Sequence, residues 1–201
     1  DDCKHHSNSL PNFNVYYAQY LMLTGNLKHA QRYLKKEPVN SENNETIASL
    51  NAEIQLRKGH TQRAKKLYKD LFKLYPKNDA YCNNIGLCYF ISRQYKIAET
   101  YFLKSTKINA DNLQAFSNLV RIYKQTKKGK KLELTLRTYL KKQPDYLPFL
   151  WSLSNIYVAQ GKFKKLSNLV SKVIQTDTDK AASLREALMV PSTYESIEQL
   201  N

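Results

Sequence analysis

The stretch DAYCNNIGLCYFISRQYKIAETYFLKSTKINADN, residues 79–112, decides the fold of this chain. It contains small residues at Gly86 and Ala98, aromatic residues at Tyr89 and Phe102, and no proline. The whole chain of 201 residues holds only 5 Gly and 6 Pro, and it is rich in Leu, Lys, Tyr and Ala. This composition suits helices joined by short turns better than sheets. We therefore expect an all-α protein that folds as one unit.

The pattern of this stretch recurs at one constant interval in both directions along the chain. Without insertions, successive repeats begin at Pro11, Glu45, Asp79, Leu113 and Leu147. Position 15 of each repeat, where the first helix should end, holds Gly25, Gly59, Arg93, Lys127 and Gly161. Glycine adopts the left-handed conformation without steric cost, so it suits a helix that reverses into its partner. In the fourth repeat we expect Gly129 to supply this conformation two residues late.

Position 20 is where the two helices of a hairpin should cross most closely. It holds Ala30, Ala64, Ala98, Leu132 and Leu166. Because small side chains permit close approach of two helices, the first three hairpins should be tightly packed. The last two hairpins, which carry leucine instead, should be splayed or shifted.

Helix starts and stops follow the same period. The residues expected to cap the first helices are Asn43, Asp111, Asp145 and Asp179. Short acidic and amide side chains accept hydrogen bonds from the unpaired amides of a first turn. Pro76 and Pro144 share position 32, where each would end a second helix because proline cannot continue it.

A period of about 34 residues is the mark of the tetratricopeptide repeat family, which this chain resembles. The third repeat resembles the family pattern most, through Ile85, Gly86, Tyr89, Tyr95, Ala98 and Phe102. Cys82, in contrast, stands where the family often has tryptophan. The resemblance covers about residues 11–180 and implies a right-handed superhelical α-solenoid of five antiparallel helix hairpins. We expect residues 1–10 to be a flexible lead-in and residues 181–201 to form a capping helix and a tail.

The family places a concave binding groove along the first helices of the hairpins. The resemblance assigns to this groove Tyr16, Gln19, Asn83, Asn84, Leu87, Asn118, Arg121, Trp151 and Asn155. Asn84 and Asn118 share one position in consecutive repeats, and an amide can pair with the backbone of an extended peptide. The alternative is that both amides bind only internal backbone or water. Trp151 is either an exposed anchor of the groove or a slipped core tryptophan.

The net charge of the chain is +15, from 25 lysines, seven arginines and 17 acidic residues. Lysine is a hydrated point charge, whereas arginine makes bidentate contacts, so this balance favours diffuse attraction to an acidic partner. The charge is densest between Arg121 and Lys142, where the basic patch comprises Lys124, Lys127, Lys128, Lys130, Lys131, Lys141 and Lys142. This patch is either a solvated outer face or a landing strip for an acidic protein, anionic lipid or nucleic acid.

No motif for catalysis or cofactor binding is present in the sequence. The histidines are too scattered to complete a Ser/His/Asp or Cys/His set; they are His5, His6, His29 and His60. Cys82 and Cys88 lie six residues apart on one predicted helix, so we expect two core residues rather than a disulfide. We expect no catalysis, no cofactor, no metal and no small-molecule substrate.

These features favour a scaffold that binds an extended peptide or helix of a partner protein within a larger assembly. Size and repeat number also resemble the tetratricopeptide lipoproteins that support pilus and secretion-system assembly in bacterial envelopes. A sequence that begins at Asp1 fits a removed leader as well as it fits a trimmed chain. The resemblance favours the periplasm, or the inner face of the outer membrane, over the cytoplasm. The alternative is a nucleic-acid-associated repeat protein, which the few arginines and the lack of an aromatic platform disfavour.

Overall fold

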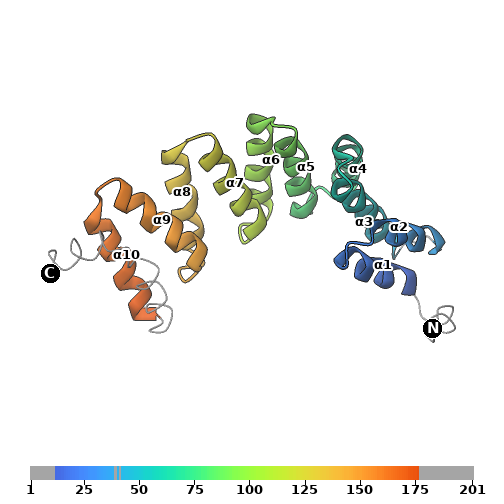
Figure 1. Ribbon diagram of the computed structural model, residues 1–201, viewed down its shortest axis with the longest axis horizontal. Coiled ribbons are helices and arrows are strands. Elements are labelled where there is room, and N and C mark those ends of the chain that lie inside the picture. Colours follow the sequence, from blue (N-terminus) through green and yellow to red (C-terminus); the bar gives the residue numbers. More distant parts are fainter. Residues whose placement is uncertain (1–11, 39, 41, 177–201) are drawn as a thin grey trace. The chain divides into compact units, whose positions relative to one another are not determined.

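The computed structural model describes residues 12–38, 40 and 42–176, and within them it contains ten α-helices and no strand (Figure 1). In chain order these are α1 (Phe13–Leu23), α2 (Leu27–Lys36), α3 (Asn44–Arg57), α4 (Thr61–Leu74), α5 (Asp79–Ile91), α6 (Tyr95–Ile108), α7 (Leu113–Gln125), α8 (Gly129–Leu140), α9 (Leu147–Ala159) and α10 (Phe163–Thr176). Odd-numbered helices are the first helices of five hairpins and even-numbered helices are the second. The predicted all-α array of helical hairpins is therefore confirmed. The predicted lead-in and capping helix lie outside the described residues.

The chain divides into two compact units, Asp1–Ala115 and Phe116–Asn201, with the boundary inside α7. That the chain folds as one unit stays a prediction, and the two units are described separately below. In a repeat array each hairpin contacts only its neighbours, so a chain of this length does not require one shared core. Unit 1 contains α1 to α6, and unit 2 contains α8 to α10 with most of α7.

The helix starts reproduce the period read from the sequence. Second helices begin at a constant spacing, at Leu27, Thr61, Tyr95, Gly129 and Phe163. The first helices begin within two residues of the predicted repeat starts. The predicted repeat register is therefore the register of the structure.

Position 15 adopts the left-handed conformation in all five hairpins, whatever its residue. The φ angles are 79° at Gly25, 81° at Gly59, 58° at Arg93, 53° at Lys127 and 63° at Gly161. The prediction for the fourth repeat is wrong, because Lys127 takes this conformation itself and the next glycine begins α8.

The same pair of backbone hydrogen bonds closes these turns. At the end of α5, the Arg93 N–H donates to the Phe90 carbonyl at 2.9 Å and the Gln94 N–H donates to the Tyr89 carbonyl at 2.9 Å. This Schellman arrangement satisfies carbonyls that the helix end would leave unpaired. The turn geometry therefore imposes the left-handed conformation even where the residue is not glycine.

The helix caps lie one residue after most of the positions predicted. Asn78 Oδ1 accepts from the Ala80 N–H at 3.1 Å at the start of α5, and Asn112 Oδ1 accepts from the Ala115 N–H at 2.9 Å at the start of α7. The capping residue of α7 is therefore Asn112 rather than the predicted Asp111.

The residues at the cap positions of α3 and α9 make no side-chain cap bond. Asn43 makes no cap bond to α3; instead it donates to the Pro38 carbonyl, between the first two hairpins, at 2.9 Å and to Asn12 Oδ1, at the start of α1, at 3.0 Å. The residue at the start of α9 is Tyr146 rather than Asp145, and its side chain makes no cap bond. Asp179 lies outside the described residues.

The core of unit 1 forms where small residues let helices approach. Ala30, Ala64 and Ala98 at the predicted crossings are fully buried. Gly86 on α5 is equally important, because a Cβ atom there would lie 2.7 Å from Phe102 Cε1 on α6. The absence of that atom lets the fully buried Phe102 ring pack against the α5 backbone.

Both cysteines that the structure describes belong to this core. Cys82 and Cys88 are free and fully buried, which confirms the expectation that they are core residues. Burial raises the pKa of each thiol to about 11. Neutral thiols of this kind serve as small apolar side chains.

In unit 2 the crossing column carries Leu132 and Leu166, and both are buried. That these two hairpins are splayed or shifted stays a prediction.

Candidate binding face on the first helices

Consecutive first helices share a face within each unit. In unit 1, Arg57 of α3 donates from Nη1 to the Met22 carbonyl of α1 at 3.0 Å, and it pairs with Glu53 at 2.5 Å. In unit 2, Lys124 Nζ of α7 donates to Ser152 Oγ of α9 at 3.3 Å. These bonds join α1 to α3 in unit 1 and α7 to α9 in unit 2 at positions that were assigned to the groove.

In unit 1 the predicted groove residues differ in how much surface they present. Tyr16 is 65% exposed and Gln19 is exposed, while Asn84 and Leu87 are half-buried. Asn83 is only 2% exposed, so its assignment to the groove is not supported and we leave it out of the face. Adjacent residues of a helix point about 100° apart, which explains why Asn83 and Asn84 have different surroundings.

Asn84 retains hydrogen-bonding capacity for a partner. Among the described residues, its side chain makes one hydrogen bond, which Oδ1 accepts from Asn83 Nδ2 at 3.4 Å. Its own Nδ2 donors therefore stay available to the backbone of a bound segment.

In unit 2 the predicted groove residues reach the surface. Arg121 and Asn155 are exposed, Asn118 is half-buried, and Trp151 is 40% exposed. The interpretation of Trp151 as a core residue is therefore wrong. Asn84 lies in unit 1 and Asn118 lies in unit 2.

One exposed aromatic residue of α1 was not predicted from the sequence. Tyr20 is 57% exposed, although the residues at the same position of the next three repeats, Ile54, Cys88 and Ile122, are fully buried. In an array, this position is covered by the preceding hairpin. We therefore do not include Tyr20 in the binding face.

Position 13 adds apolar surface that the sequence reading did not name. Leu23 of α1 and Ile91 of α5 both lie there, and both are exposed. The sequence allowed this prediction, because the family resemblance places position 13 of each repeat in the groove. We define the first-helix face of unit 1 as Gln19, Leu23, Asn84, Leu87 and Ile91.

Net charge is segregated between the two kinds of helix. The five first helices contain three basic and three acidic residues, whereas the five second helices contain 18 basic and three acidic residues. The second helices therefore carry a net charge of +15, which equals the net charge of the whole chain. The first helices of unit 1 carry a net charge of −2 and those of unit 2 a net charge of +2, so each set carries less charge than the second helices of its unit.

The predicted basic patch is spread over two helices and two turns of unit 2. Lys124 lies on α7, the pair at 130 and 131 lies on α8, and the remaining four lie in the turns after these helices. All except Lys128 are exposed. Glu133 offsets part of this charge, since it pairs with Lys162 at 3.3 Å and with Arg137 at 3.9 Å.

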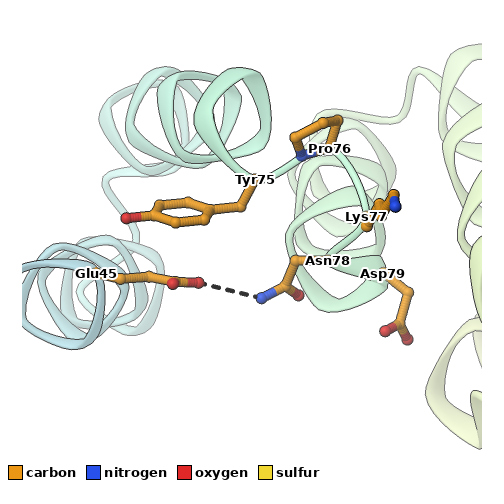
Figure 2. A pocket seen from close by; sticks show the side chains of 6 residues that line it. All are labelled: Glu45, Tyr75, Pro76, Lys77, Asn78 and Asp79. Carbon is orange, nitrogen blue, oxygen red and sulfur yellow. Dashed lines mark hydrogen bonds between the residues drawn. The ribbon is translucent and has the colours of Figure 1, made fainter. Parts of the chain in front are cut away.

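A polar depression lies between α3 and the turn that joins α4 to α5 (Figure 2). It has a volume of about 680 Å³ and is lined by Glu45, Tyr75, Pro76, Lys77, Asn78 and Asp79. Figure 2 shows Glu45 reaching across to Asn78, with Nδ2 to Oε1 at 3.4 Å, and the same oxygen accepts from the Tyr81 hydroxyl at 2.7 Å. Burial, and then Glu45, raises the pKa of Tyr81. These groups bind one another, so they tie the second hairpin to the third.

The described residues contain no group of three or more His, Cys, Asp or Glu side chains that could hold a metal ion. Within the same part of the chain, no helix has the length and apolar character needed to cross a membrane.

Comparison with known proteins agrees with this geometry. A tetratricopeptide repeat model matches residues 80–112, which is the stretch that decides the fold. Comparison with curated protein sequences finds no match. The chain contains a tetratricopeptide repeat, and its fold is that of tetratricopeptide repeat proteins.

Three solved structures show the likeness of fold. MamA from Desulfovibrio magneticus RS-1 is 18% identical with a TM-score of 0.60, over 82% of this chain and 93% of that one. TTC0263, a thermophilic TPR protein from Thermus thermophilus, is 15% identical with a TM-score of 0.59, over 90% and 100%. YrrB, described as a TPR protein with an unusual peptide-binding site, is 14% identical with a TM-score of 0.55, over 92% and 97%.

Proposed function

We propose that this chain is a non-catalytic scaffold that binds a segment of a partner protein along its first helices. The observation that carries the proposal is the near-neutral first-helix face, on a chain whose net charge lies on its second helices. A face that combines apolar side chains with available amide donors suits an extended peptide or a helix. The apolar groups supply burial, and the amides pair with backbone groups whatever the partner's side chains are.

In unit 2, Trp151 is the proposed anchor of the equivalent face. A partly exposed indole contributes a large apolar area at small cost in conformational entropy, which is why tryptophan is enriched at the centre of protein interfaces. Arg121 and Asn155 would supply polar contacts beside it. YrrB, which shares the fold, is described as having a peptide-binding site, which supports a similar use of the fold here.

We propose further that the partner belongs to a bacterial envelope assembly such as a pilus or secretion complex. The support for this setting is the likeness in size and repeat number to the tetratricopeptide lipoproteins of those systems. Cell fractionation with an antibody against this chain tests it. Recovery in the cytoplasmic fraction alone would exclude the envelope setting and leave the scaffold proposal intact.

Site-specific photocrosslinking in cells of the source organism tests the binding face. A photoreactive phenylalanine derivative replaces Leu87 on α5 or, as a matched control, Leu103 on α6, which is 40% exposed and lies on a second helix. We expect a discrete protein adduct from position 87 and none of the same mass from position 103. Adding Asn84→Ala should reduce the yield of that adduct. Equal adducts at both positions, or none at 87, would contradict the proposed face.

A further inference from the structure

Two lysines of α4 lie over one aromatic ring of α5. Lys65 and Lys69 of α4 place their Nζ atoms 4.7 Å and 5.5 Å from the ring centre of Tyr89 on α5. The Tyr89 ring stacks on Tyr101 of α6, with 5.5 Å between ring centres and 18° between planes. We call these four residues the lysine–tyrosine cluster. Three consecutive helices of unit 1 contribute to it.

A third lysine extends the cluster along the same pair of second helices. Lys104 of α6 lies over the Phe72 ring of α4, with Nζ 4.6 Å from the ring centre. Attraction between an ammonium group and an aromatic ring holds each side chain in place. The Tyr89 side chain raises the pKa of Lys69 above its ordinary value.

The positive charge of this region has no carboxylate to balance it. Among the described residues, Lys65, Lys69 and Lys104 have no acidic side chain within ion-pair distance. Two ammonium groups on one ring repel each other, and this repulsion is less screened at a half-buried site than in bulk water. An anion between Lys65 and Lys69 would relieve it.

We propose that the lysine–tyrosine cluster is a docking surface for an acidic polypeptide segment, whose Asp or Glu carboxylates bridge Lys65 and Lys69. It differs from the first-helix face in its charged groups, because its lysines belong to α4. The chain would then bind two partner segments, a near-neutral one on its first helices and an acidic one on its second helices.

Charge alone suits any polyanion, and two observations favour a polypeptide. Nucleobases bind proteins by stacking on free aromatic faces, but the Tyr89 ring is already covered by lysine and stacked on Tyr101. An anionic bilayer first meets the most exposed cations. Lys65 and Lys69 are half-buried, whereas their neighbour Lys66 is exposed. A single extended chain can reach half-buried ammonium groups that a bilayer surface does not.

Fluorescence anisotropy with a fluorescein-labelled peptide of ten glutamates tests this proposal. The cluster variant is Lys65→Gln with Lys69→Gln, and the control is Lys28→Gln with Lys35→Gln on α2, where both lysines are exposed. Both variants lose two positive charges, so they differ only in the site. We expect the cluster variant to bind the peptide about tenfold more weakly than wild type, since each lost contact was charge-assisted, and the control about twofold more weakly.

Three results would overturn the proposal. The wild-type chain could fail to bind the peptide at low ionic strength, or the two variants could weaken binding equally, which indicates unspecific attraction. The same variants are also measured with a ten-nucleotide uridine RNA and with phosphatidylserine vesicles. A loss confined to RNA or vesicles in the cluster variant would assign the cluster to that polyanion instead. Unchanged thermal unfolding of both variants shows that each is folded.

Discussion

Replacing Gly86 with alanine tests the packing that holds the third hairpin together. The added Cβ atom would lie 2.7 Å from Phe102 Cε1, 2.8 Å from Phe102 Cδ1 and 3.2 Å from Tyr101 Cβ. Carbon atoms pack best at about 3.5–4.0 Å, so both ring contacts are repulsive. The Phe102 ring is fully buried and has little room to move.

The magnitude follows from two opposing effects. Overpacking a well-packed core costs about 1–3 kcal/mol, and the severe contacts with a buried ring place Gly86→Ala in the upper part of that range. Alanine also favours a helix interior over glycine by about 1 kcal/mol. We therefore expect a net loss of about 1–2 kcal/mol in the free energy of unfolding.

Hydrogen exchange measured by mass spectrometry is the suitable assay, because it reports on α5 and α6 separately from unit 2. A single unfolding midpoint would mix the two units. Gly129→Ala is the control, since nothing lies within 4 Å of a Cβ atom added there, and it should leave protection unchanged or slightly raised. On a Phe102→Leu background, Gly86→Ala should cost less by at least about 0.5 kcal/mol, which is the coupling expected of residues in contact. A neutral or stabilising Gly86→Ala would refute the packing argument.

Four further changes test the turns, caps and core. Arg93→Gly should stabilise unit 1 by about 1 kcal/mol, measured by hydrogen exchange of α5 and α6, because Arg93 adopts φ 58° and a left-handed conformation costs a non-glycine residue about 1–2 kcal/mol. Asn78→Ala should cost about 1 kcal/mol through loss of the cap bond to the α5 amide, whereas Asn78→Ser should retain most of it. Ser154→Ala should stabilise unit 2 by about 1 kcal/mol, measured by hydrogen exchange of α9, since the buried Ser154 hydroxyl has no hydrogen-bond partner among the described residues. Burial raises the pKa of the Cys82 and Cys88 thiols from 9.0 to about 11. These thiols therefore ionise at lower pH in the unfolded chain than in the folded one, and the free energy of unfolding should fall as the pH rises from 9 towards 11. Replacing both cysteines with alanine should remove this part of the pH dependence.

The sequence predicted the helices and turns well because both depend on the repeated pattern. A constant repeat period with glycine in one column fixes where each first helix ends. The sequence could not show that Arg93 and Lys127 occupy the same left-handed turn. At these positions the helix reversal, rather than the residue's own preference, sets the conformation. The caps were displaced for a different reason, since Asp111 and Asn112 are adjacent and both residue types cap well.

The candidate site was less predictable because exposure depends on packing between repeats. The family resemblance placed Asn83 and Asn84 together in the groove, and only the structure shows that Asn83 is buried. The composition could not decide whether Trp151 is an exposed anchor of the groove or a core residue. Tyr20 is exposed at a position that is buried in the next three repeats, because coverage by a preceding hairpin is not a property of the residue.

The net charge of the chain gives a misleading description of its binding surface. Taken over the whole sequence, +15 suggests a protein attracted to any polyanion. The helix bounds divide this charge so that the first helices are neutral and the second helices carry all of it. Electrostatic attraction acts over about a Debye length, roughly 8–10 Å at physiological salt. An acidic segment on the first helices is therefore still attracted by the lysines of the second helices. We therefore expect the second helices to accelerate association of a mildly acidic partner while the contacts of the first-helix face set its rate of release. Added salt should slow association at both faces, but it should shorten the bound lifetime only at the lysine–tyrosine cluster.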